Sequence, residues 1–136
     1  MDQILSKYQP QALSLLRFIT GLLLFQYGAA KILKFPSGTP FEKVELFSLI
    51  GAAGTIELIL GALLIIGLWT RIAAFILSGE MAFAYFLGHM FKTGSAVLHP
   101  LFNGGTGAIL FCFACLYLST AGGGPYSVDA AMGKKD

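Results

Sequence analysis

The stretch from Leu49 to Phe91 constrains the fold more than any other part of the chain. It consists of two apolar segments joined by GLWTR (residues 67–71), and each segment is long enough to cross a lipid bilayer as a helix. Each also carries one carboxylate near its middle, Glu57 in the first and Glu80 in the second. A charged side chain at the bilayer centre costs roughly 2.5–3.5 kcal/mol on insertion scales, so such residues usually face the interior of a helix bundle. Any function is therefore best sought around these two glutamates.

The composition of the whole chain is typical of a membrane protein. Of the 136 residues, 56% are hydrophobic and 12% are charged, and the mean hydropathy is +0.75. Soluble domains carry about a quarter charged residues. The length predicts a single domain over residues 1–136. A formal net charge of +2, without a basic stripe, argues against nucleic acid as a partner.

Four apolar segments predict an all-α, integral-membrane fold. They cover about residues 12–33, 49–68, 71–91 and 102–121, lengths that suit transmembrane helices. Joined in order, they form an antiparallel bundle of four transmembrane helices with both termini on one side. The termini and the short corner carry four basic residues, and the two longer loops carry three, so the positive-inside rule favours the cytoplasm for both termini.

The deepest polar residues are predicted to form an inner cluster of Arg17, Glu57 and Glu80. Antiparallel helices that rise about 1.5 Å per residue bring the two glutamates to nearly the same depth. Arg17 begins roughly 8 Å inside the terminal-side face, and its long side chain can lean further inward. One cation facing two carboxylates leaves one negative charge without a partner, so we expect one glutamate to bind a proton.

A second set of polar side chains is predicted to gather toward the two longer loops, where it is suited to line a pocket or half-channel. The set comprises Gln26, Tyr27, Lys31, His89 and Asn103. A purely structural alternative is open: Arg17 pairs with one glutamate to fix helix register, while Lys31 only reaches toward the interface.

The two cysteines, Cys112 and Cys115, lie three residues apart and share one face of the predicted fourth helix. Reactive Cys-x-x-Cys pairs depend on a thiolate stabilised at a helix N-terminus, whereas this pair lies in the middle of an apolar segment. We therefore interpret both as small buried hydrophobic residues and leave redox activity open. With no further cysteine and no adjacent histidine or carboxylate, a metal site is not predicted.

Short motifs occur along nearly the whole chain in an informative order. LRF (residues 16–18) precedes GL (21–22), FQYGAAK (25–31) follows, and IE (56–57) leads through Gly61 to GLWTR (67–71). MA (81–82), YF (85–86), His89 and NGG (103–105) complete the series. Together they resemble the motifs of the DoxX family of small four-helix bacterial membrane proteins. Tyr27 and Thr106 stand where that family frequently has His and Glu.

The resemblance implies a bacterial cell (inner) membrane location and a link to redox chemistry, because relatives include a subunit of a membrane thiosulfate:quinone oxidoreductase. The first hypothesis is therefore a membrane subunit of a redox complex, partnered or homo-oligomeric, that touches the quinone pool. No redox centre is evident in the sequence, so the electrons would have to come from a partner. A quinone is the candidate cofactor, and Arg17, Glu57, Glu80 and His89 are the candidates to supply its hydrogen-bond donors and proton relay.

Two other functions stay open. One is a small proton-coupled transporter or channel, and the other is a non-catalytic scaffold subunit whose polar residues only set helix register. Whether the protein is an enzyme is also open.

Overall fold

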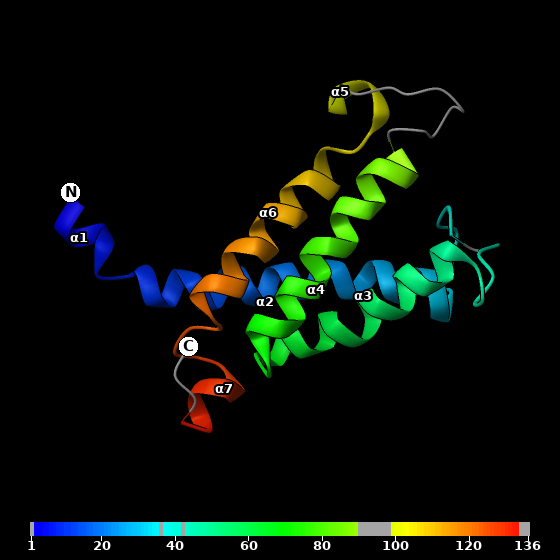
Figure 1. Ribbon diagram of the computed structural model, residues 1–136. Coiled ribbons are helices and arrows are strands. Elements are labelled where there is room, and N and C mark those ends of the chain that lie inside the picture. Colours follow the sequence, from blue (N-terminus) through cyan, green and yellow to red (C-terminus); the bar gives the residue numbers. More distant parts are fainter. Residues whose placement is uncertain (1, 36, 42, 90–98, 134–136) are drawn as a thin grey trace.

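A computed structural model describes residues 2–35, 37–41, 43–89 and 99–133 of the chain (Figure 1). Those residues form helices and connecting turns, with no strand among them, which confirms the all-α prediction. The helices, in chain order, are α1 (Asp2–Ser6), α2 (Gln9–Gly28), the π-helix η1 (Ala29–Leu33), α3 (Leu49–Ile66), α4 (Thr70–Phe83), the π-helix η2 (Ala84–His89), α5 (Pro100–Asn103), α6 (Thr106–Ala121) and α7 (Val128–Ala131).

Three helices are long and apolar enough to cross a membrane. They are α2 with η1 (Gln9–Leu33), α3 (Leu49–Ile66), and α4 with η2 (Thr70–His89). Their bounds agree with the predicted segments 12–33, 49–68 and 71–91 to within a few residues, and residues 90 and 91 lie outside the described part. The corner between α3 and α4 is tight because Gly67 and Trp69 both adopt left-handed backbone conformations, with φ of 73° and 51°.

For the fourth segment, predicted over residues 102–121, the predicted start of the helix was wrong. Gly104 has a φ of 73° and ends the four-residue α5, so α6 begins only at Thr106. A left-handed residue cannot continue a right-handed helix, which is why the apolar run does not become one helix. At 16 residues, α6 is about 24 Å long, shorter than the roughly 30 Å hydrocarbon core, so its crossing of the membrane stays a prediction.

The helices pack as two antiparallel pairs, α2 with α3 and α4 with α6. Contacts between the pairs run mainly from α3 to α4, and Figure 1 shows the pairs lying close near α7 and diverging away from it. We call the end near α7 the corner end and the opposite end the loop end. A single evenly packed four-helix bundle stays a prediction.

Glycines bring α2 and α3 into close contact. A Cβ on Gly28 would lie 2.4 Å from the backbone nitrogen of Leu58, and one on Gly21 would lie 2.7 Å from the Cβ of Leu64. Real atoms do not approach so closely, so both positions need glycine. Such small residues let membrane helices approach each other, because lipid supplies no hydrophobic force between them.

The outside of the helices is apolar. Phe75, Phe83, Leu110 and Phe113 are each at least 63% exposed. Large contiguous apolar surfaces are rare on soluble monomers. These faces therefore fit a protein that sits in a lipid bilayer.

The fully buried core lies in the corner half of the molecule. Its members with no exposed surface are Leu24, Leu64, Ala73, Ala74, Leu77, Cys115 and Leu118. They close the space between the middle of the helices and the corner end.

The segment that follows α6, residues 122–131, folds back over the corner, and we call it the clasp. Asp129 is its key residue: it is 2% exposed, and its Oδ1 and Oδ2 accept hydrogen bonds from the backbone N–H groups of Trp69 and Thr70, each at 2.9 Å. Its own N–H donates to the Gly67 carbonyl at 2.9 Å. Asp129 thus acts as the N-cap of α4 from about 60 residues away along the chain, a role that the sequence analysis missed.

Candidate functional site

Arg17 does not form the predicted cluster with Glu57 and Glu80. It is 4% exposed, and its Nη1 donates to the carbonyl oxygens of Gly123 at 2.8 Å and Tyr126 at 3.0 Å. The clasp supplies both acceptors, so Arg17 is held at the corner end. The prediction was wrong because it counted only charged partners, whereas folded-back carbonyl groups satisfy a guanidinium equally well in geometry.

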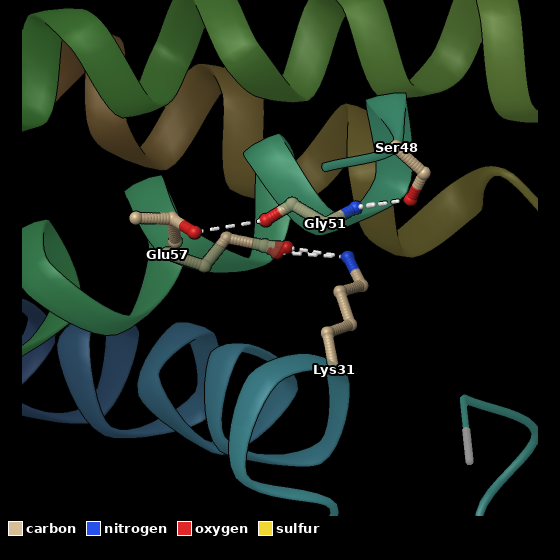
Figure 2. Close-up of polar contacts among 5 residues, drawn as sticks. Lys31, Ser48, Gly51 and Glu57 are labelled. Atoms are coloured by element: carbon tan, nitrogen blue, oxygen red, sulfur yellow. Dashed lines mark hydrogen bonds and ion pairs between the residues drawn. The ribbon is translucent and has the colours of Figure 1, made fainter. Parts of the chain in front are cut away.

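Glu57 pairs instead with Lys31. The Lys31 Nζ lies 2.6 Å from Glu57 Oε1 and 2.9 Å from Oε2, and Figure 2 shows the lysine reaching from η1 across to α3. The side chains are 12% and 1% exposed, so water hardly screens the pair. The structure therefore joins one residue from each of the two predicted polar sets.

Two local features hold Lys31 in place. Gly54 leaves room for it, since a Cβ on Gly54 would lie 2.6 Å from the Lys31 Cβ. Lys34, in a left-handed conformation at the end of η1, donates from Nζ to the Lys31 carbonyl at 2.8 Å and to the Phe41 carbonyl at 3.2 Å. Lys34 also bonds the Val44 carbonyl, so it ties the loop back onto the end of η1.

Glu80, on α4, is the second buried carboxylate at this level. Both of its oxygens are buried, and neither has a hydrogen-bond partner among the residues described. Glu57 and Lys31 are its main charged neighbours. We call Lys31, Glu57 and Glu80 the buried site: one satisfied ion pair beside one carboxyl group with unused hydrogen-bonding capacity.

Comparison with known proteins places the chain in a family. Residues 12–90, from α2 to η2, match the family model described as DoxX. The chain belongs to the DoxX family. It is also 40% identical over 132 residues to an uncharacterized protein of Haemophilus influenzae, an alignment that covers 96% of this chain and 98% of the relative. No solved structure matches the chain.

The matched region of this DoxX protein contains the whole buried site and Arg17, whereas α6 and the clasp lie outside it. The clasp residues that bind Arg17 and cap α4 were therefore not indicated by the motifs. A sequence signal did exist: Ser127 followed by Asp129 is a helix-start pattern, and the three preceding glycines permit a close approach to α2. For example, a Cβ on Gly124 would lie 2.3 Å from the Ser14 hydroxyl.

Aromatic rings surround the ammonium group of Lys31 in this DoxX protein. Its Nζ lies 5.8 Å from the centre of the Tyr27 ring and 5.2 Å from that of Phe41, within the range of cation–π attraction. The Tyr27 ring also meets Phe41 and Phe111 edge to face. Tyr27 thus contributes packing around the ion pair.

The other predicted site residues fall in different places. Gln26 is exposed on α2. His89, at the loop end of η2, is half-buried, and its Nδ1 is buried without a hydrogen-bond partner in the described structure. Asn103 ends α5, but its side chain lies outside what the structure describes.

The two cysteines of this DoxX protein are both unbridged. Cys115 is buried in the apolar core and Cys112 is half-buried, with its carbonyl oxygen accepting a hydrogen bond from Ser78 Oγ at 2.8 Å. Within the described ranges, no group of three or more His, Cys, Asp or Glu residues is arranged to hold a metal ion.

Two surface hollows lie away from the buried site. One, of about 360 Å³, is lined by residues of the loop before α3, including Lys43 and Ser48, and the other, of about 410 Å³, is lined by Ser14, Arg17 and Tyr126. Neither is lined by a residue of the buried site. Both oxygens of Glu80 are buried, so a ligand would reach them only if the side chains that cover them moved.

Proposed function

We propose that this protein is a membrane subunit of a redox complex and that its buried site binds a quinone head group. The observation that carries the proposal is the combination of the Lys31–Glu57 pair with the unpartnered carboxyl of Glu80. Intramembrane ionisable residues commonly mark ligand or proton pathways. Here Glu57 and Glu80 lie about midway along α3 and along α4 with η2, helices whose outer surfaces are apolar.

The chemistry of a quinone fits these groups. Reduction to the quinol adds two electrons and two protons, and a buried carboxyl beside the ring can exchange protons with it. Lys31 can donate a hydrogen bond to a quinone carbonyl oxygen. A partner oxidoreductase subunit supplies the electrons, which is why the proposal is a subunit of a complex.

The topology proposed for this function has four membrane crossings. The clasp contacts Arg17 of α2 and the α3–α4 corner, so the chain returns after α6 to the side on which α2 begins. If α4 crosses the membrane, α6 must cross back. We propose that the protein lies in the bacterial inner membrane, as the family resemblance implies, with both termini in the cytoplasm, as the distribution of basic residues favours.

Binding of a short-chain menaquinone to the purified protein in detergent tests the proposal. Isothermal titration compares the wild type with Glu57→Gln, Glu80→Gln and the matched control Glu45→Gln, an identical change at an exposed loop position. We expect each site variant to bind at least tenfold more weakly, about 1.4 kcal/mol, and the control to bind like the wild type. Absence of saturable binding by the wild type, or equal binding by all four proteins, would refute it.

A proton-coupled transporter is the second candidate, because the same unpartnered carboxyl of Glu80 suits a carrier that binds a proton with its solute. Solute uptake into vesicles driven by a proton gradient, and abolished by Glu80→Gln, would favour it. Variants that change stability alone would favour the scaffold.

A further inference from the structure

Among the residues that the structure describes, Glu80 has no cation that is available to it. Lys31 is its main cationic neighbour, but the Lys31 ammonium already contacts both oxygens of Glu57 at 2.6 and 2.9 Å. Within the described ranges, the other titratable groups near it are Glu57 on α3 and the Cys115 thiol on α6, with His89 further along its own helix. An ionised Glu80 would add an unmatched negative charge to this site.

The carboxyl group is also without hydrogen-bond donors. Neither oxygen has a partner in the described structure, and both are buried. A buried carboxylate is stabilised by donors or by a cation, and where both are missing the group takes up a proton instead. Together, the charge arrangement and the missing donors single out Glu80, rather than Glu57, as the proton-binding member of the buried site.

The structure also indicates which end of the molecule exchanges the proton. On the corner side of Glu80, Leu64, Leu77 and Leu118 have no exposed surface, and the clasp covers the end beyond them. Toward the loop end, η2 carries His89, whose Nδ1 is buried and unpartnered in the described part of the chain. About 13 Å of helix separates Glu80 from His89, too far for a direct hydrogen bond.

The two π-helices strengthen this assignment. Both lie at the loop end, η1 carrying Lys31 and η2 carrying His89. One extra residue in a helical turn rotates the residues beyond it by about 100°, and such segments recur at functional sites. Lys31 and His89, a cationic and a titratable side chain at the loop end, thus both lie in π-helical segments.

We infer that Glu80 is a proton-loading carboxyl group that exchanges its proton with the loop end of the protein and not with the corner end. The inference concerns the site of the proposed function but needs no quinone. It holds equally for a redox subunit and for a carrier, so its test and the quinone-binding test can fail separately.

Dicyclohexylcarbodiimide, a lipid-soluble reagent, reports a protonated carboxyl group inside a membrane. The carboxyl proton moves to a carbodiimide nitrogen while a carboxyl oxygen bonds to the central carbon, and an oxygen-to-nitrogen acyl shift then gives a stable N-acylurea. Nothing leaves, so the modified peptide gains the mass of one reagent molecule. The wild-type protein is labelled in vesicles and the label is located by mass spectrometry.

We expect at least tenfold more label on Glu80 than on Glu57 or Glu45, and a decline of the label as the pH is raised. Glu57 is the internal control for a buried but ion-paired carboxylate, and Glu45 for an exposed one. Preferential labelling of Glu57, or none at Glu80, would overturn the assignment without any variant having to fold.

The direction of exchange is tested with a water-soluble carbodiimide applied to vesicles of each orientation. Label on Glu80 is expected when the loop that contains Lys43 faces the reagent. Equal or greater label when the corner end faces it would overturn the loop-end route.

Discussion

Glu57 is a buried charged side chain and Lys31 a largely buried one, and each compensates the charge of the other. Two hydrogen bonds of 2.6 and 2.9 Å join them, and Tyr27 and Phe41 cover the ammonium group. Such a pair adds little over an apolar pair of the same volume, but removal of one partner leaves a buried charge uncompensated. Single and double substitutions of the pair should therefore differ measurably in their effect on the free energy of unfolding.

Lys31→Met is expected to lower the free energy of unfolding by about 3–5 kcal/mol, because Glu57 loses its partner. The double variant Lys31→Met/Glu57→Gln should recover much of that loss, since neither charge then remains. Thermal melting in one detergent compares the two with the wild type. A double variant at least as unstable as the single one would contradict this account of the pair.

The identity of the buried residues could be predicted from sequence, but their partners could not. A carboxylate in the middle of an apolar segment is visible without a structure, and Glu57 and both carboxyl oxygens of Glu80 are indeed buried there. Glu57 pairs with Lys31 and not with Arg17 because of two features that leave no periodic pattern in the sequence. These are the π-helix that carries Lys31 and the clasp carbonyls that accept hydrogen bonds from Arg17.

At the scale of helices, glycine has opposite roles on different faces. On α2, Gly28 allows the close contact with α3, whereas on α4 a Cβ added to Gly79 would meet no heavy atom within 4 Å. The two positions form a matched pair for the same substitution.

Gly28→Ala should destabilise the protein by about 1–3 kcal/mol, because the new methyl group forces α2 away from Leu58. Gly79→Ala should leave the melting temperature unchanged or raise it, because alanine favours a helix more than glycine does. Melting of the two variants under identical conditions is the measurement. Equal losses at both positions would show that the α2–α3 contact is not close.

The start of α4 depends on Asp129 of the clasp, which accepts two backbone hydrogen bonds there. Asp129→Ala should lower the free energy of unfolding by about 1–3 kcal/mol, because the Trp69 and Thr70 N–H groups, the second of them buried, lose a charged acceptor. Asp129→Asn should cost less, because one oxygen remains.

Hydrogen exchange at the Trp69 and Thr70 amides provides a local measurement of the cap. Both amides should exchange faster in Asp129→Ala, while amides in the middle of α3 keep most of their protection. Unchanged exchange at these two amides would mean that α4 is capped in some other way.

Apolar runs predicted the existence of the long helices well, because burial in lipid requires both apolar side chains and internally bonded backbone. They predicted ends poorly. The apolar run that includes α6 extends beyond it, but the left-handed Gly104 interrupts the helix, and no apolar run indicates that the clasp folds back after Ala121. Ends are set by single backbone conformations and by distant contacts, which hydropathy does not report.

At the scale of the whole molecule, the side of the membrane on which each segment lies is the open question. Tyr8, Lys43 and Met132 are exposed positions near the start of α2, in the first long loop and after α7. In a background with Cys112→Ala and Cys115→Ala, the single changes Tyr8→Cys, Lys43→Cys and Met132→Cys give three reporters.

A membrane-impermeant maleimide should label Tyr8→Cys and Met132→Cys from one side of the membrane and Lys43→Cys from the other. The reason is that the clasp binds residues at the corner end and so cannot lie across the membrane from them. Labelling of Met132→Cys from the same side as Lys43→Cys would contradict a membrane-crossing α6.

The bond between Arg17 and the clasp has a consequence for how the chain is made. Its carbonyl acceptors lie 106 and 109 residues later in the sequence. At about 5–20 residues per second, synthesis reaches them on the order of 5–20 s after Arg17. During that interval the Arg17 guanidinium needs other hydrogen-bond acceptors. Arg17 lies in the first half of α2, from where a long side chain can extend to the lipid head groups. Its position in the first half of α2 thus lets the lipid head groups serve as a temporary partner for a charge whose final partners have not yet been synthesised.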